Sequence, residues 1–594
     1  MKLLRLKITD LKGFRGLPCG FEHDFRSKID LDEELAHPDD FAPFVCAGQN
    51  GSGKSNVLEA LAIIFFQLEV FRVRRNFLPI DFIYDAEENP EGLKERDYSP
   101  NAFELEYLIK VPKDYCRELE QNWAHVRVWK DPDTSVKLHW ENQQYFNVDV
   151  MSEFSGGFLD ILLPDYVLAY SSGGNETLSL PFFKMRFLQF DEYINFLNTG
   201  SAYPDTPETR LTYLDNSFSQ AILISNWLFN DAPSLKPFTD TVGLQDLKEF
   251  RIILKPSVEF KLSNHQKYQK NAVSQPDGIS ENNTYFLPIL RPLETNHDTI
   301  KENGHSNALI DKFKRCATCY FLDDDRNELI LDYCVNTATK KAFQDNFMDA
   351  IELFQAFQIL LTLNLYSVSD KLKTGVYASK SQYVNETIPL LASEERVMRF
   401  KFVKFSKLGV DEAVMLRNLS DGEHQFLHSL GLCLLFKNTN SLFLLDEPET
   451  HFNPNWRASF ISQLKACLGN TKKTPEMIIT THSPFLISDS KKNKVLEFRK
   501  DKITNKVSVK RARYNTLGAS INLITMETFH KRATIGRGAY QILQNLVSDP
   551  TKKNSPHELA KLIMNTMGDS IERTFAVQSV LTGSEFPNDQ DDSE

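Results

Sequence analysis

The chain has 594 residues, of which 41% are hydrophobic and 25% are charged, the composition of a folded globular protein. At about 150 residues per domain, this length allows roughly four domain-sized units and excludes a peptide or a single small module. The 68 basic and 80 acidic residues give 68 − 80 = −12, so a general attraction to nucleic acid or to a membrane surface is excluded, although a local basic groove is not.

Cysteine usage and hydropathy indicate the compartment. Disulfide frameworks belong to short, cysteine-dense secreted domains, whereas the eight cysteines here are scattered along a long chain. Charged residues interrupt the first apolar run well short of a signal-peptide core. The longest apolar stretches, 57–71 and 427–436, fall below the ~18 to 20 residues needed to cross a bilayer. We therefore expect a soluble, cytoplasmic protein without a membrane segment.

The first elements alternate between strand and helix. Residues 3–8 alternate apolar and basic side chains and residues 44–47 are short and apolar, so both segments are predicted to be strands. Between them, residues 20–41 carry many acidic side chains, which predicts a solvated excursion rather than a core element. From residue 56 to about 71, apolar residues repeat at helical spacing.

A glycine-rich run joins the second strand to this helix. It reads Gly48-Gln49-Asn50-Gly51-Ser52-Gly53-Lys54-Ser55 and fits the pattern G-x-x-x-x-G-K-S in the strand-to-helix context that the pattern requires. The glycines let backbone N–H groups surround a β-phosphate, and the helix N-terminus adds partial positive charge. We expect Lys54 to reach the β- and γ-phosphates and Ser55 to offer its hydroxyl to Mg²⁺.

The middle of the chain is predicted to contain strands, a long loop and helices, and it offers fewer candidate binding or catalytic residues. Short alternating runs at 103–109, 126–129 and 136–140 predict antiparallel strands with one wet face. The polar stretch 263–308 predicts a long loop. Apolar residues at helical spacing predict a helical region over 343–366, and residues 397–405 alternate as a strand.

Cys316 and Cys319 form the single closely spaced cysteine pair. The apolar runs on either side of Asp324-Asp325-Arg326-Asn327 favour a β-hairpin over a zinc hook, which would need long flanking heptads. Whether the two thiols bind a metal stays open at this point.

Two helix and strand boundaries in the C-terminal half carry polar groups that suit phosphate chemistry. Leu419-Ser420-Asp421-Gly422-Glu423 precedes an apolar helix, so Ser420 and Gly422 offer a hydroxyl and bare N–H groups at a helix N-terminus, although read alone the segment is an ordinary capping box. The apolar strand 441–445 ends in Asp446 and Glu447, two adjacent carboxylates that a buried strand does not itself require. Asp446 is expected to hold Mg²⁺ and Glu447 to polarise the attacking water as a general base.

A histidine ends the next apolar strand. His482 in Thr480-Thr481-His482-Ser483-Pro484 follows Met477-Ile478-Ile479, at the strand end where open α/β sheets bind ligands. It is a candidate contact for the γ-phosphate. The remaining 112 residues are predicted to be mostly helical, with a disordered acidic tail that contains Asp589, Asp591, Asp592 and Glu594.

Taken in order, these motifs resemble the ABC-type ATPase head, with its Walker A loop, signature, Walker B strand and switch histidine. The segments Leu11-Lys12-Gly13-Phe14-Arg15 and Pro448-Glu449-Thr450-His451-Phe452-Asn453-Pro454 look like the DNA-repair and phage-defence branch that includes SMC, RecF and OLD-like proteins. The resemblance covers roughly residues 1–70 and 400–500. It implies an α/β fold with a mixed central sheet, an antiparallel β subdomain, a large α+β insertion with a helical lid, and a C-terminal helical region.

The resemblance also implies the site and its cofactors, ATP and Mg²⁺. Lys54, Glu447 and His482 would act in hydrolysis, and Ser55 and Asp446 would hold the metal. The nucleotide would contact Gly48, Asn50, Gly51, Gly53, Lys54, Ser55 and Asn56 in cis and Ser420 and Gly422 from a second head. A homodimer or higher oligomer through the heads is therefore implied. Asp421 and Glu423 replace the usual Gly and Gln of the signature, and Gln189 is a weak candidate for the Q-loop glutamine.

Within this branch, the sequence is most similar to the PtuA-like ATPases of Septu-type and retron-linked anti-phage defence systems. Sustained heptads are absent from 171–400, and the 112 residues after His482 are too few for the Toprim domain of an OLD-type nuclease. The run from Tyr170 to Phe182 and the segment Gly568-Asp569-Ser570-Ile571-Glu572-Arg573 look like the restriction-associated members. The implied domains are a head N-lobe at 1–170, an insertion and lid at 171–400, a head C-lobe at 401–510 and a partner-docking region at 511–594.

Three functional classes stay open. In the first, the protein is an ATP-gated subunit that senses or clamps nucleic acid, DNA or a retron msDNA, and controls a separately encoded HNH-type, PtuB-like nuclease. In the second, it acts directly on DNA as a repair or OLD-like ATPase or nuclease, although no His-Asn-His or PD-(D/E)-x-K arrangement is present. A transporter ATPase is the third, without a coupling partner in this chain.

Overall fold

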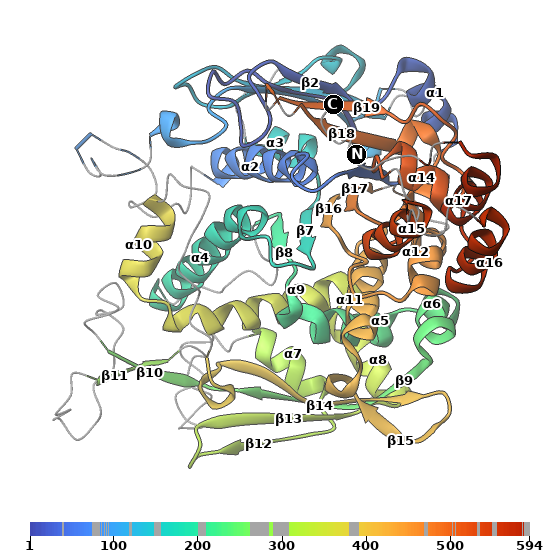
Figure 1. Cartoon of the computed structure of the whole chain (residues 1–594). Helices are drawn as coiled ribbons and strands as arrows, with labels where there is room; N and C mark the ends of the chain where they lie inside the picture. Colours follow the sequence, from blue (N-terminus) through green and yellow to red (C-terminus); the bar gives the residue numbers. More distant parts are fainter. Residues whose placement is uncertain are drawn as a thin grey trace, which may run out of the picture.

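The structure is a computed structural model of the whole chain (Figure 1). It describes all residues except 38–40, 74–83, 85, 88–89, 91, 93, 118–121, 148–155, 200–208, 262–283, 289–307, 379–390, 469–472, 474, 502, 505, 532–534, 549–554, 585 and 587–594. The predicted disordered tail and most of the predicted loop at 263–308 therefore lie outside the described residues. Among the helices that are described, none is long and apolar enough to cross a membrane.

A seven-stranded sheet in the order β19-β18-β3-β17-β16-β7-β8 forms the centre of the fold. Neighbouring strands pair in parallel except at one edge, where β18 and β19 are antiparallel. The strands are β3 (Phe44–Gly48), β7 (Val167–Ser171), β8 (Leu211–Tyr213), β16 (Leu442–Asp446), β17 (Glu476–Thr481), β18 (Val495–Lys500) and β19 (Val507–Arg511). β3, β16 and β17 are buried along their whole length, so β3 and β16 read as apolar runs rather than as alternating ones, whereas β17 has an apolar centre at 477–479 between buried polar residues.

Helix α2 (Lys54–Val73) follows β3 and is buried on nearly all sides. It lies between the central sheet and a five-stranded antiparallel sheet in the order β2-β1-β4-β5-β6 (Figure 1). The strands of this second sheet are β1 (Lys2–Ile8), β2 (Phe21–Asp24), β4 (Phe103–Lys110), β5 (Trp123–Lys130) and β6 (Lys137–Trp140). Phe65 of α2 packs against Tyr107 of β4 with ring centroids 6.0 Å apart. The antiparallel strands predicted between 103 and 140 are confirmed.

A second lobe contains another antiparallel sheet, in the order β12-β13-β9-β14-β15. Its strands are β9 (Leu244–Leu254), β12 (Cys319–Asp323), β13 (Glu328–Cys334), β14 (Met398–Lys407) and β15 (Val410–Met415), and β10 (Ser257–Lys261) pairs separately with β11 (Thr284–Pro288). The predicted hairpin around residues 324–327 is therefore confirmed as β12 and β13. The stretch predicted to be a long loop contains β11, a strand.

Helices join this lobe to the central sheet (Figure 1). Among them are α5 (Ser219–Phe229), α9 (Ala350–Thr362) and α11 (Asp421–Leu435). The other described helices between residues 156 and 488 are α3 (Gly156–Leu162), α4 (Glu176–Thr199), α6 (Ala232–Val242), α7 (Ala308–Cys316), α8 (Thr337–Asn346), α10 (Asp370–Ala378), α12 (Pro454–Leu468) and α13 (Pro484–Ser488). The helical region expected at 343–366 is divided between α8 and α9, because Asp349 caps a new helix by accepting a hydrogen bond from the Glu352 N–H. The boundary proposed at 170/171 falls inside β7, and β8 of the central sheet lies in the segment assigned to the insertion.

After His482 the prediction of a mostly helical segment missed β18 and β19, two strands of the central sheet, and the chain that follows β19 is helical as predicted. Helix α14 (Ile521–Glu527) packs against the central sheet through Ile524, which shares an apolar cluster with Val45 and Val495. Helices α15 (Arg537–Ser548), α16 (Pro556–Thr566) and α17 (Ile571–Thr582) have a small apolar core of their own, built on Leu543, Leu559, Ile563 and Ala576.

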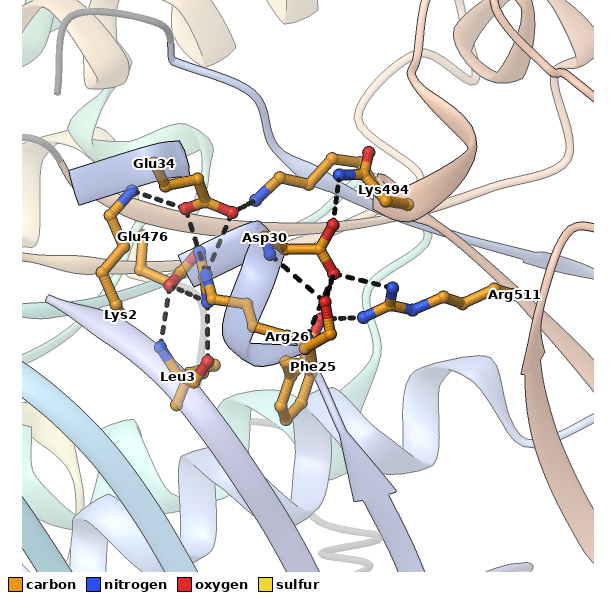
Figure 2. A network of polar contacts seen from close by, with 11 residues as sticks. Lys2, Leu3, Phe25, Arg26, Asp30, Glu34, Glu476, Lys494 and Arg511 are labelled. Atoms are coloured by element: carbon orange, nitrogen blue, oxygen red, sulfur yellow. Dashed lines mark hydrogen bonds and ion pairs between the residues drawn. The ribbon is translucent and has the colours of Figure 1, made fainter. Parts of the chain in front are cut away.

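The prediction of a solvated excursion over 20–41 is wrong. Residues 21–24 form β2, and Ser27 starts helix α1 (Lys28–Ala36) with a capping box that includes Asp30. The acidic residues mislead because several of them are paired inside the protein rather than solvated. Asp30 binds Arg511, and Glu34 accepts from Arg26, Lys2 and Lys494 in the cluster that Figure 2 displays.

This buried charge cluster joins three segments that are far apart in sequence. Arg26 donates to the Leu3 carbonyl at 2.6 Å and to Glu476 at 2.9 Å, and the Leu3 N–H donates to Glu476 at 2.8 Å (Figure 2). Burial alone would favour the neutral form of Glu34, but the cations around it lower its pKa to about 2. Because each of these buried charges has oppositely charged partners, the cluster fastens α1 and β1 to the start of β17.

Candidate functional site

The phosphate loop between β3 and α2 has the backbone that its glycines permit. Gly48, Gly51 and Gly53 have φ angles of 148°, 72° and 94°, a region that residues with a side chain rarely adopt. A Cβ on Gly48 would also lie 2.4 Å from the Phe498 carbonyl oxygen of β18. The Ser52 hydroxyl is buried and makes no hydrogen bond within the described residues. The loop is therefore shaped to present polar groups inward, and it fits the phosphates of a nucleotide.

Lys54 lies at the start of α2 with its side chain buried against the loop. Its Nζ atom is 3.2 Å from the Gly48 carbonyl oxygen, 3.1 Å from that of Gln49 and 2.9 Å from His482 Nε2. Burial lowers the pKa of Lys54, and the nearby carboxylates of Glu447 and Asp446 oppose that shift. The first lysine of α2 thus places a cation at the mouth of the loop, where the sequence predicts phosphate.

Asp446 ends β16 beside this helix and accepts from several side chains. Its Oδ1 atom accepts from the Ser55 hydroxyl at 2.8 Å and from the Thr480 hydroxyl at 2.6 Å. Its Oδ2 atom accepts from the Asn175 amide at 3.1 Å and from Ser171 at 3.4 Å. The structure thereby brings together the two residues predicted to hold Mg²⁺, and a hydroxyl beside a carboxylate is a donor set that suits this hard cation.

Glu447 continues the chain in a left-handed conformation with φ of 50°, which is uncommon for a residue with a side chain. Its N–H lies 3.2 Å from the Thr480 carbonyl oxygen and 3.1 Å from the Thr480 hydroxyl. The carboxylate, which is partly exposed, lies 3.2 Å from His482 Nε2. This hydrogen bond to His482 lowers the pKa of Glu447 despite partial burial, so the carboxylate is ionised and able to accept a proton.

One nitrogen of His482 makes both contacts. Nε2 is 2.9 Å from the Lys54 ammonium, to which it must offer a lone pair, and 3.2 Å from Glu447, to which it must offer a proton. A neutral imidazole cannot do both at Nε2, so these two partners compete. The His482 ring also stacks on the ring of Phe529, with ring centroids 6.2 Å apart. The Phe529 carbonyl oxygen accepts a hydrogen bond from the Gln49 amide of the phosphate loop.

The signature segment lies at the start of α11. Ser420 is exposed and caps the helix in a capping box with Glu423, whose carboxylate also binds Lys407. Gly422 packs so closely against the loop after β16 that a Cβ would lie 2.8 Å from the His451 carbonyl oxygen. Among the described contacts, none joins Ser420 or Gly422 to the phosphate loop of the same chain.

The other predicted contacts of the nucleotide are placed as follows. Asn50 and Gly51 are exposed at the tip of the loop. The Asn56 amide donates to Glu59 at 3.1 Å, one turn further along α2. Gln189 is buried within α4, fourteen residues or about 20 Å along the chain from Asn175. We find the Asn175 amide, rather than Gln189, next to Asp446.

Sequence reasoning missed three residues of this site. Asn175 and Thr480 are hydrogen-bonded to Asp446, and Phe529 stacks on His482. The polar run after β7 is a signal for Asn175, since β7 neighbours β16 and parallel strands present their carboxyl ends at one edge. No signal in the sequence points to Phe529, because its approach depends on how the last part of the chain folds back.

The two closely spaced cysteines, Cys316 and Cys319, lie in different surroundings. Cys316 is buried and donates to the Ala342 carbonyl at 3.4 Å, whereas Cys319 is exposed on β12. Within the part of the chain that the structure describes, no group of three or more His, Cys, Asp or Glu side chains is arranged to hold a metal ion.

Together, the parallel sheet, the phosphate loop after β3 and the carboxylates after β16 define a P-loop ATPase. Residues 320–488 match the family described as "AAA domain, putative AbiEii toxin, Type IV TA system". That segment contains Ser420, Asp446, Glu447 and His482 but not the phosphate loop.

Similar solved structures include SMC heads. The Smc head bound to the C-winged helix domain of ScpA is 14% identical, with 86% of this chain and 98% of that chain covered and a TM-score of 0.30. The Smc head domain with an extended coiled coil bound to the C-terminal domain of ScpA, from Pyrococcus furiosus, is 12% identical, with 86% and 96% covered and a TM-score of 0.29. No curated protein matches the chain.

Proposed function

We propose that the protein hydrolyses ATP as a subunit of a prokaryotic anti-phage defence complex. The observation that carries the ATPase assignment is the meeting of Lys54, Asp446, Glu447 and His482 at the carboxyl ends of β3, β16 and β17. In this proposal the phosphate loop and Lys54 bind the triphosphate, and Ser55 and Asp446 hold Mg²⁺. The metal, when bound, neutralises phosphate charge.

Glu447 is the general base in this reaction. Its ionised carboxylate accepts a proton from the water that attacks the γ-phosphorus, while the bond to the β–γ bridging oxygen breaks. Lys54 donates hydrogen bonds to the phosphate oxygens as negative charge moves toward the leaving diphosphate. When Lys54 turns to phosphate, His482 Nε2 is released from one of its two competing partners, which suits a residue that reports the γ-phosphate.

The signature acts on a second chain. Ser420 is exposed, has a hydroxyl at the N-terminus of a fifteen-residue helix and has no contact with its own phosphate loop among the described residues. A head-to-head dimer brings it to the nucleotide of its partner. Ser420→Arg should then abolish ATP-dependent pairing and hydrolysis while ATP binding persists, and hydrolysis that survives this change contradicts the arrangement.

The C-terminal helices are proposed to dock an HNH-type nuclease. Several of their apolar side chains are exposed, namely Ile542, Met564, Ile571, Phe575 and Leu581. The chain just before them touches the site through Phe529, which supports a route by which the nucleotide state reaches the docked partner. DNA or another nucleic acid is the proposed trigger.

The experiment is a parallel assay of ATP turnover and plasmid cleavage. The purified chain should hydrolyse ATP without cutting DNA, and DNA cleavage should appear with the product of the neighbouring gene. Deleting residues 540–594 should abolish co-purification of the two proteins and leave ATP turnover largely intact. Plasmid cleavage by the chain alone, lost in a Lys54→Ala variant, favours instead an ATPase that acts directly on DNA.

A further inference from the structure

The sheet of the second lobe has two edge strands with different side chains. On β15, Asp411 and Glu412 are exposed charges of the kind that discourage pairing with another strand. On β12, no residue from 319 to 322 is charged, and all four are exposed. Tyr320, Phe321 and Leu322 are 57%, 53% and 44% exposed. Within the part of the chain that the structure describes, no strand pairs with the outer edge of β12. An edge with three large exposed apolar side chains in sequence is a site where another strand is expected to pair.

The two ends of β12 carry opposite charges. Lys314 and Arg315 form the last turn of α7, just before the strand, and the Lys314 ammonium lies 5.4 Å from the Tyr320 ring. Directly after the strand, the hairpin turn contains the exposed Asp324 and Asp325, and the exposed Arg326 of the same turn lies 4.0 Å from Asp323, so the turn with Asp323 keeps a net negative charge. A strand that is preceded by basic residues and followed by acidic ones is complementary to an antiparallel copy of itself and repels a parallel copy.

We propose that β12 pairs with β12 of a second copy of this chain, antiparallel and centred on Phe321. In this register Tyr320 lies opposite Leu322 of the other copy, and each basic end of α7 faces the acidic turn of the other copy. The contact is the same surface on both chains, so it closes as a twofold dimer. It joins two five-stranded sheets into one continuous sheet.

This contact is separate from the ATPase site and does not rest on the proposed function. Figure 1 shows β12 at the far side of the molecule from β18 and β19, which border the phosphate loop. Head pairing through the signature, which does rest on the proposed function, would give the chain a second and different self-contact. The combination of the two contacts produces assemblies of more than two copies.

The first experiment measures mass in solution by sedimentation equilibrium, without nucleotide and with a chelator, so that ATP-dependent head pairing is absent. The wild-type chain should have twice the 68.3 kDa of one copy, and Phe321→Asp should reduce it to one copy. Val410→Asp, at an exposed position on the other edge strand, is the matched control and should leave the dimer intact. A monomeric wild type, or a Phe321→Asp variant that remains dimeric, overturns the proposal.

The second experiment tests the register. Phe321→Cys places two thiols opposite each other with Cα atoms about 4.5 to 5.5 Å apart, a spacing that allows a disulfide. Oxidation should crosslink this variant between residues 321 of two chains, and Val410→Cys should not crosslink. Arg315→Glu should weaken the dimer at least tenfold, and adding Asp324→Arg should restore it. If β12 is covered by another part of its own chain or by another protein, the wild type should be monomeric and Phe321→Cys should not crosslink, which overturns the proposal.

Discussion

Each end of strand β17 belongs to a cluster of charged groups, and the two clusters differ in how completely those groups are paired. At its start, Glu476 is buried and fully paired with Arg26 and the Leu3 N–H (Figure 2). At its end, Thr480 and His482 meet Lys54 and a partly exposed Glu447. In the first cluster, every charged side chain has an oppositely charged partner, although the cations outnumber the carboxylates. In the second cluster, one imidazole nitrogen of His482 has two competing partners.

Structural and catalytic charge clusters in this molecule differ in whether each charged group has one possible arrangement or several. A buried carboxylate whose acceptors are all occupied has a lowered pKa and one arrangement, and it fastens segments together. A carboxylate in a left-handed conformation, beside a histidine with shared contacts, has alternatives that a bound nucleotide can select. Charge alone, which both clusters have, does not distinguish them. Variants at each end are expected to affect different properties.

The largest effect is expected for Lys54→Ala, in the cluster at the end of β17. The loop loses its one lysine over the phosphates, and ATP binding measured by calorimetry should fall below detection. The exposed Lys12→Ala is the control and should bind ATP as the wild type does. An unchanged ATP affinity of Lys54→Ala refutes the assignment of the phosphate loop.

At the other end, Glu476→Gln should reduce the free energy of unfolding by about 3 kcal/mol, because Arg26 keeps its charge in a buried site with less compensation. Denaturant titration measures this loss. ATP affinity of the folded variant should not change, since Glu476 and His482 are six residues apart along extended chain, or about 20 Å. Glu33→Gln, on the exposed side of α1, should cost less than about 0.5 kcal/mol.

A smaller effect is expected for Asn175→Ala. Asp446 loses one of its donors but keeps Ser55 and Thr480, so hydrolysis should fall by about tenfold while ATP still binds. Steady-state phosphate release measures the change. Gln189→Ala should leave the hydrolysis rate of the folded protein unaltered, and the reverse ranking of these two variants contradicts the placement of Asn175 in the site.

The effect with the narrowest range of conditions is a pH dependence of stability in the charge cluster at the start of β17, since it appears only in acid. The pKa of Glu34 is about 2 in the folded protein against an ordinary 4.5, so the folded state binds this proton less readily. Its contribution is therefore fully present above about pH 4.5 and is lost as the pH falls toward 2. In Glu34→Gln, the acid branch of the stability curve should be flatter. Equal acid slopes in the two proteins argue against the pairing.

The phosphate loop and the carboxylate pair could be predicted because their spacing and strand context are local. The order of β3, β17 and β16 then determines that Lys54, Asp446 and His482 meet. The acidic run at 20–41 does not reveal its structure locally, because the partners of Glu34 and Asp30, such as Lys494 and Arg511, come from the other end of the chain. The approach of Phe529 to His482 depends in the same way on a contact between distant segments.

The most direct measurement of the central claim is ATP turnover by Glu447→Gln compared with the wild type, in the presence of Mg²⁺ and at equal amounts of folded protein. The change removes the proton acceptor but leaves Ser55 and Asp446 in place. The account predicts that hydrolysis falls by ~10² or more while ATP remains bound. Turnover close to that of the wild type contradicts the claim that the end of β17 and β16 is the catalytic site.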